Sequence, residues 1–191
     1  MFRLGFVLVI FISGCVFGSI SDFSEADIKG SQNEIYNSSF EIISEQDEYE
    51  LPGWILLDNS ESFVSIVNSD FNSGQYSLKI SKPNQKINLV SDSFPIDPES
   101  VYFNRLFVKT NYKSNHFIEI QFVAFDANGK KINDFETKYY PDDIWTKATL
   151  TTGFFKQNVR FARIIITIPA RDDKVFWLDD IESYKVYKIQ K

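Results

Sequence analysis

The chain has 191 residues and a formal net charge of −6, a length that corresponds to one substantial domain. An acidic chain without a cluster of lysine and arginine is a poor ligand for nucleic acid and for anionic lipid surfaces, so we expect no nucleic-acid partner. Its single cysteine excludes an intrachain disulfide, and its single histidine excludes a zinc site built on histidine pairs.

The N-terminus has the pattern of a secretory signal peptide. Arg3 precedes an apolar run over residues 4–12, which is too short to span a bilayer as a helix, and small residues follow the run. The segment Ile12-Ser13-Gly14-Cys15 resembles the lipobox of bacterial lipoproteins, in which the cysteine is acylated and becomes the new N-terminus. The resemblance implies removal of residues 1–14 and lipidation of Cys15 by fatty acids such as palmitate.

We therefore expect an extracytoplasmic protein that is tied to a membrane through its lipid anchor. Val16 is not the aspartate that retains lipoproteins at the inner membrane of some Gram-negative bacteria. That difference favours the outer membrane if the source has one. Residues 15–32 are mostly polar without sustained periodicity, which predicts a flexible tether, so the domain is expected over residues 33–191.

From residue 33 onward, short β-patterned runs alternate with turn signals. Asn72-Ser73-Gly74 is one turn signal, and Asp126-Ala127-Asn128-Gly129 predicts a tight hairpin. Strands at this spacing, without a convincing amphipathic helix, predict an all-β fold, an antiparallel β-sandwich. The predicted strands cover residues 62–68, 75–81, 101–110, 117–125, 131–138, 145–151, 160–168 and 174–187.

Strict alternation along three of these strands separates a core face from an outer face. The rows expected to face the core are Tyr102, Asn104, Leu106 and Val108; Ile118, Ile120, Phe122 and Ala124; and Ala162, Ile164, Ile166 and Ile168. The opposite rows are expected to share the outer face of one sheet, and they contain Phe103, Arg105, Phe107, Glu119, Gln121 and Arg163.

Seven short motifs, in order along the chain, resemble those of family 4/9-like carbohydrate-binding modules. They are Asn37-Ser38-Ser39-Phe40-Glu41, Pro52-Gly53-Trp54, residues 72–78, residues 102–109, residues 125–130, residues 142–147 and residues 176–181. The set covers about residues 33–190. The resemblance implies a galactose-binding-like jelly roll that binds a polysaccharide or another glycan without altering it.

The same resemblance implies a structural Ca²⁺ held by Glu41 and by Asp179 or Asp180. Calcium takes several carboxylate and carbonyl oxygens, so the residue types suit it. The alternative, a solvated Glu41 and an aspartate that caps a strand end, stays open.

The outer row of six residues supplies the candidate ligand-binding residues. A sugar offers C–H faces to aromatic rings and hydroxyls to arginine, glutamine and glutamate, and the row contains both kinds of partner. The alternative is an ordinary solvated sheet face with paired charges.

Two other functions remain as alternatives to glycan binding. One is a structural lipoprotein with protein partners at the cell surface, which uses the same fold without sugar. The other is a hydrolase, because residues 45–50 match the E-x-D-x-x-E pattern of some β-sandwich glycosidases. Retaining hydrolysis needs two carboxylates about 5–5.5 Å apart on a rigid frame, whereas this run is an acidic loop, so we expect no enzymatic activity.

Overall fold

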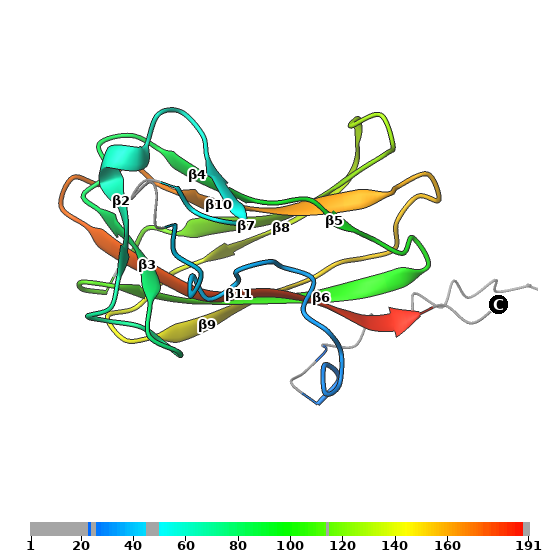
Figure 1. The fold of residues 1–191 in the computed structure, drawn as a ribbon, viewed down its shortest axis with the longest axis horizontal. Coiled ribbons are helices and arrows are strands. Elements are labelled where there is room, and N and C mark those ends of the chain that lie inside the picture. The colour runs from blue at the N-terminus through cyan, green and yellow to red at the C-terminus, as the bar shows by residue number, and fades with distance from the viewer. Residues whose placement is uncertain (1–22, 24–25, 45–49, 114, 189–191) are drawn as a thin grey trace, which may run out of the picture.

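The computed structural model describes residues 23, 26–44, 50–113 and 115–188, which form two antiparallel β-sheets packed face to face (Figure 1). The predicted signal peptide and Cys15 lie outside the described residues, as do residues 45–49 of the acidic loop. Within the described part, no helix is long and apolar enough to cross a membrane.

The six-stranded sheet has the order β1-β4-β10-β7-β8, with β5 pairing beside β4 on the edge of β10. Its strands are β1 (Trp54–Leu56), β4 (Ile87–Ser91), β5 (Phe94–Pro95), β7 (Ile118–Phe125), β8 (Lys131–Tyr139) and β10 (Phe161–Ile168). The five-stranded sheet has the order β2-β3-β11-β6-β9. Its strands are β2 (Val64–Val67), β3 (Ser77–Ser81), β6 (Ser100–Thr110), β9 (Thr146–Thr151) and β11 (Val175–Lys188), and a short 3₁₀ helix η1 (Glu61–Phe63) precedes β2.

The predicted β-sandwich is confirmed, and all eight predicted strands are present with ends that differ by a few residues. Three short strands, β1, β4 and β5, were not predicted. In β4 four of five residues are buried, so the strand shows no alternation of apolar and polar residues. β4 is a strand because it pairs with β1 and β10, and no local sequence pattern predicts this pairing.

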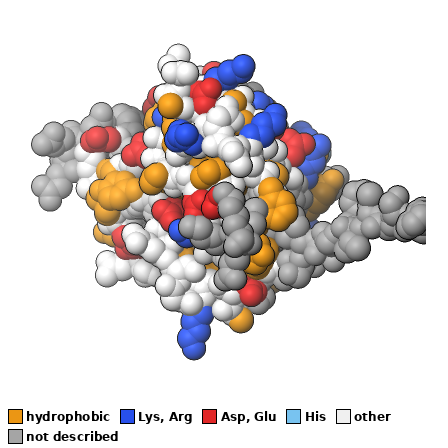
Figure 2. Space-filling view, turned by 90° about the vertical axis from the view of Figure 1, so that its right-hand side faces the viewer, with side chains coloured by type: hydrophobic (Ala, Val, Ile, Leu, Met, Phe, Trp, Pro, Cys, Tyr) orange, Lys and Arg blue, Asp and Glu red, His pale blue; other side chains and the backbone are white. Residues whose placement is uncertain are grey.

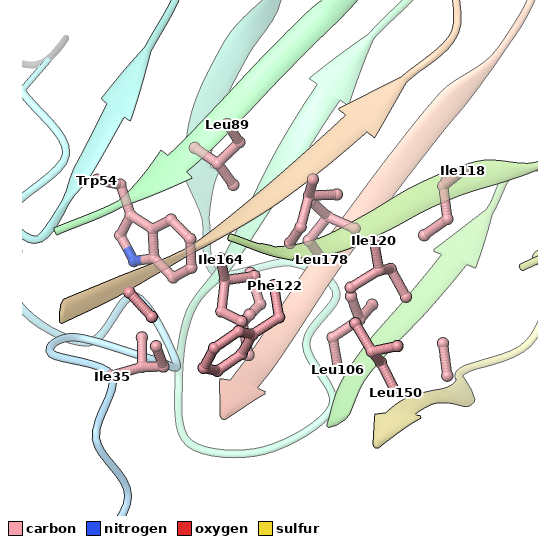
Figure 3. Close-up of a cluster of buried hydrophobic side chains, with 14 of the residues drawn as sticks. Ile35, Trp54, Leu89, Leu106, Ile118, Ile120, Phe122, Leu150, Ile164 and Leu178 are labelled. Atoms are coloured by element: carbon pink, nitrogen blue, oxygen red, sulfur yellow. The ribbon is translucent and has the colours of Figure 1, made fainter. Parts of the chain in front are cut away.

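The three predicted core rows do face the space between the sheets. Phe122 lies at the centre, with its ring centroid 5.8 Å from that of Phe94, 5.7 Å from that of Tyr102 and 5.6 Å from that of Phe155. Figure 3 shows Ile120 and Phe122 of β7 facing Leu106 and Leu178 of the other sheet. One continuous apolar core therefore holds the two sheets together.

The segment before residue 40 runs along β11 (Figure 1). Asn33 forms an antiparallel bridge with Tyr184, the Glu34 N–H donates to the Ser183 carbonyl at 2.9 Å, and Ile28 is only 8% exposed. This contact covers an edge of β11 beyond the end of β3. Ile28 and the residues around Asn33 thus pack against the sandwich.

Candidate functional site

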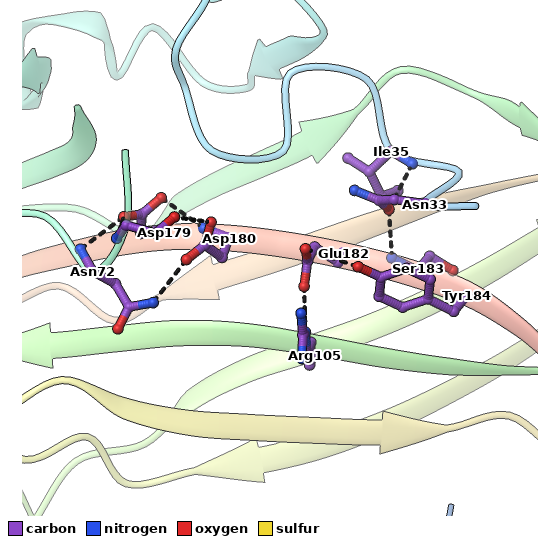
Figure 4. Close-up of polar contacts among 10 residues, drawn as sticks. Asn33, Ile35, Asn72, Arg105, Asp179, Asp180, Glu182, Ser183 and Tyr184 are labelled. Carbon is purple, nitrogen blue, oxygen red and sulfur yellow. Dashed lines mark hydrogen bonds and ion pairs between the residues drawn. The ribbon is translucent and has the colours of Figure 1, made fainter. Parts of the chain in front are cut away.

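The three candidate calcium ligands converge on one turn, residues 72–76. Figure 4 shows Asp179 and Asp180 beside Asn72 of this turn. Oδ2 of Asp179 accepts hydrogen bonds from the backbone N–H of Asn72 at 2.8 Å and of Ser73 at 3.1 Å. The Asp180 carboxylate accepts from Asn72 Nδ2 at 2.7 Å and from the Ser73 hydroxyl at 2.8 Å. These bonds satisfy donors of the turn that no sheet partner reaches.

Glu41 holds the other half of the turn. Its Oε1 accepts from the backbone N–H of Gln75 at 2.8 Å and of Tyr76 at 3.0 Å. Gly74 lies between with φ +66°, and a Cβ there would lie 2.2 Å from Glu41 Oε1. Both the backbone conformation and the close approach of the carboxylate therefore require glycine at this position.

Asp179 and Asp180 sit at an irregularity of β11, where the register with β6 shifts between Asp179 and Glu182. Asp180 adopts φ +45°, a conformation that aspartate tolerates better than most residues. Asp179 is fully buried, and neither aspartate has an ion-pair partner in the described part of the chain. Burial raises the pKa of Asp179 to about 7, against the opposing effect of the Ser73 N–H, and the neighbouring Asp180 charge adds to the rise.

The fit of this cluster to calcium is partial. Carboxylate oxygens are the ligands that Ca²⁺ prefers, and an uncompensated buried carboxylate favours a cation nearby. However, N–H and O–H donors already occupy the oxygens of Asp179, Asp180 and Glu41 Oε1. In the portion of the chain that the structure describes, no group of three or more histidine, cysteine, aspartate or glutamate side chains is placed to hold a metal ion. Calcium therefore stays a prediction.

The expectation that the six candidate ligand-binding residues share one face is wrong. Phe103, Arg105 and Phe107 belong to β6 of the five-stranded sheet, whereas the other three belong to β7 and β10 of the six-stranded sheet. Outward-facing residues of the two sheets lie on opposite sides of the sandwich. The connection between β6 and β7 crosses from one sheet to the other, so the two strands are neighbours in sequence but not in a sheet.

Of the half of the row on the five-stranded sheet, Arg105 is engaged in internal contacts (Figure 4) and Phe107 is half-buried. Arg105 bonds to Glu182 through its Nε, its guanidinium lies 5.6 Å from the ring centroid of Tyr184, and the Tyr184 hydroxyl donates to Glu182 at 2.9 Å. Phe103 is only 3% exposed. This network neutralises the charge of Arg105, and the burial of Phe103 removes its ring from solvent.

The half on the six-stranded sheet lies on a hollowed face. The first hollow is open to solvent and has a volume of about 290 Å³, and its lining residues are Lys86, Phe117, Glu119, Thr167, Pro169 and Ala170. Gln121 donates through Nε2 to Glu119 at 2.6 Å, so both predicted residues of β7 belong to this region. Tyr140, which is 58% exposed, packs edge-on against Phe117 with ring centroids 5.9 Å apart.

A second hollow, also open to solvent, lies farther along β10 and has a volume of about 360 Å³. Arg163, the third predicted residue of this half, lines it together with Leu57, Val90, Phe125, Gly129, Phe161 and Ile165. Both volumes fall in the range of ligand pockets, about 300–1,000 Å³, or just below it. The six-stranded sheet therefore supplies the candidate ligand-binding surface.

Sequence reasoning missed Phe117, Phe125 and Phe161 as lining residues. Phe125 and Phe161 are cross-strand partners that stack outward with centroids 5.3 Å apart and an interplanar angle of 16°. Their alternation with Val123 and Arg163 was available as a signal, because residues two apart on a strand share a face.

Charges of both signs are interspersed with separate hydrophobic side chains on the end of the sandwich shown in Figure 2.

No protein-family model and no curated protein matches the sequence. Solved structures match the fold, among them a CBM61 module in complex with β-1,4-galactotriose, with 13% identity, 81% of this chain and 99% of that chain covered, and a TM-score of 0.53. The CBM22-1 xylan-binding domain of Xyn10C from Paenibacillus barcinonensis matches with 16% identity over 83% and 97% of the two chains, at a TM-score of 0.57.

A cyclase from Fischerella sp. TAU also matches, with 12% identity over 84% of this chain and 100% of that chain and a TM-score of 0.59. The predicted likeness in fold to carbohydrate-binding modules is thus confirmed, and the fold is the jelly-roll sandwich. Identities this low show the fold alone, and the same architecture carries binding modules and a cyclase, so the function must be argued from the surface.

Asp179 makes the stability of the fold depend on pH. We predict that the free energy of unfolding decreases as the pH rises from about 4 to about 7, because in that window the folded state retains a proton that the unfolded chain has released. Urea denaturation across this window measures the decrease. Asp179→Asn should flatten the slope, whereas Asp143→Asn, which changes an exposed carboxyl, should leave it unchanged. An equal slope in Asp179→Asn would contradict the assignment.

Proposed function

We propose that this protein binds a glycan, without altering it, on the outer face of the six-stranded sheet. The observation that carries the proposal is the pair of hollows on that face, in which aromatic rings lie beside hydrogen-bonding side chains. The likeness in fold to carbohydrate-binding modules supports it.

The first hollow has the chemistry that a sugar ring needs. The rings of Phe117 and Tyr140 offer apolar surface to C–H faces, and Tyr140 also carries a hydroxyl. Glu119 and Thr167 supply acceptors and a donor for hydroxyl groups, and Lys86 adds a cation at the rim. Lys138 Nζ lies 4.6 Å from the centroid of Phe117 and is a further donor at this edge.

The pair of catalytic carboxylates expected of a glycosidase gains no support from this surface. The E-x-D-x-x-E run falls largely on residues 45–49, which lie outside the described residues, so catalysis there stays untested. The lining of the first hollow contains one carboxylate, Glu119, whereas hydrolysis of a glycosidic bond ordinarily requires two that flank the bond. Binding without hydrolysis is the function that this surface supports best.

We predict that Phe117→Ala and Glu119→Gln each weaken glycan binding by about tenfold or more, because each removes a contact that the sugar would make in a partly desolvated hollow. Glycan-array screening of residues 26–191 followed by titration calorimetry measures the loss. Phe107→Ala, on the five-stranded sheet, is the matched control and should retain full affinity. A loss in Phe107→Ala with none in Phe117→Ala would move the site to the other sheet. Absence of any glycan binding, with a protein partner recovered instead, would favour the structural alternative.

The proposal includes attachment to a membrane through lipidated Cys15, supported by the lipobox-like segment at residues 12–15. Lipid chains contribute about 0.8 kcal/mol per buried methylene, so two or more chains give lasting attachment. We predict that Cys15→Ser leaves the protein unprocessed and without acyl chains, which mass spectrometry of the detergent-extracted protein detects. A mature wild-type protein that still begins at Met1 would refute the anchor.

Calcium at the turn of residues 72–76 is the remaining part of the proposal, and the buried, uncompensated Asp179 supports it. A ligand that binds only the folded state raises its stability, so EDTA should lower the melting temperature and added Ca²⁺ should restore it. Glu41→Gln, which keeps one acceptor oxygen for the turn but removes the charge, should abolish this response. An identical melt in EDTA and in Ca²⁺ would remove calcium from the account.

A further inference from the structure

The second hollow differs from the first in its chemistry. Its walls are apolar: Phe125 and Phe161 stack at one end, Ile165 continues the outward row of β10, and Leu57 and Val90 close the side toward β1 and β4. The turn of the β7–β8 hairpin reaches it through Gly129. Arg163 is the one charged side chain among the lining residues.

Arg163 has no internal counterion in the described part of the chain. It is half-buried, and it makes no ion pair or side-chain hydrogen bond there. On the side of β7 and β8, the row of Arg163 leads across Val123 to Asp134, and Asp134 pairs instead with Lys131 at 3.1 Å. Arg105 on the opposite face shows the contrast, because Glu182 neutralises it.

The stem of a half-buried arginine can cover apolar surface while its head stays solvated, and a guanidinium with no internal counterion keeps its planar fork of N–H donors for a carboxylate. The chain as a whole carries an excess of acidic residues, so the Arg163 guanidinium makes the second hollow a locally positive site on an acidic protein. The hollow therefore suits a ligand group that presents an apolar face to Phe125 and Phe161 together with one carboxylate. A sugar ring that bears a carboxylate combines the two.

We infer that the second hollow binds a uronic acid residue of the glycan, with Arg163 contacting its carboxylate. The inference rests on the proposed glycan-binding function and narrows the class of ligand. Thr167 of the first hollow and Arg163 of the second lie on the same face of β10, four residues apart, or roughly 13 Å. An extended saccharide can therefore occupy both hollows, with its acidic residue in the second.

Titration calorimetry with oligosaccharides of galacturonate, glucuronate and mannuronate, each beside its carboxyl-reduced neutral counterpart, tests the inference. Wild-type protein should bind one uronate about tenfold or more tightly than its neutral counterpart, and added salt should weaken only the acidic ligand. Arg163→Gln should abolish the preference, so that the uronate and its neutral counterpart bind with equal affinity. Arg163→Lys, which keeps the charge but loses the planar fork, should retain part of it.

Lys147→Gln is the matched control, because it removes one positive charge from the five-stranded sheet, and it should keep the full preference. Thermal melts confirm that each variant is folded. If wild-type protein binds neutral glycans but prefers no uronate, or if Arg163→Gln keeps the preference, the inference is overturned while glycan binding stands. If the protein binds no glycan of either kind, the proposed function falls with it.

Discussion

The geometry around the β11 irregularity depends on one set of contacts: the carboxylates of Asp179 and Glu41 accept the backbone N–H donors of the turn at residues 72–76. Asp179 reaches the N–H groups of Asn72 and Ser73, and Glu41 reaches those of Gln75 and Tyr76. Unpaired N–H groups in a partly buried turn would each cost free energy. Three segments far apart in the sequence are thereby joined at one point, beside the start of β3.

The same irregularity decides which surface is available to a ligand. Beyond it, Ile181 and Ser183 face the core, and Glu182 and Tyr184 face outward. Glu182 then meets Arg105 from the neighbouring strand, so the outer face of the five-stranded sheet is occupied by its own ion pair and by an aromatic ring. On the six-stranded sheet, hollows lie in front of Glu119 and Arg163 instead.

Local pattern was sufficient for the strands and their core-facing residues, because alternation is a property of a single strand. Ile118, Ile120 and Phe122 could be assigned to the core without knowing their neighbours. The sheet to which a strand belongs is a long-range property, and β6 and β7, although consecutive, fall in different sheets. The expectation that the six candidate residues share one face was wrong for that reason alone. The motifs around Glu41 and Asp179 did meet in space, because they flank a turn that needs carboxylate acceptors whether or not a metal is bound.

The segment around Ser31 and Asn33 lies against Lys185 and Ser183 of β11, on the side of the sandwich away from both hollows. If the protein is held by its N-terminus, as proposed, a tether that leaves from this side would not obstruct the outer face of the six-stranded sheet. A pulling force on a bound glycan would then pass through the apolar core, from β10 to β11, before it reached the tether. If the N-terminus is the proposed anchor, the contacts nearest to it, the buried Ile28 side chain and the bond from the Ser31 hydroxyl to the Lys185 carbonyl, would carry that load before those of Asn33.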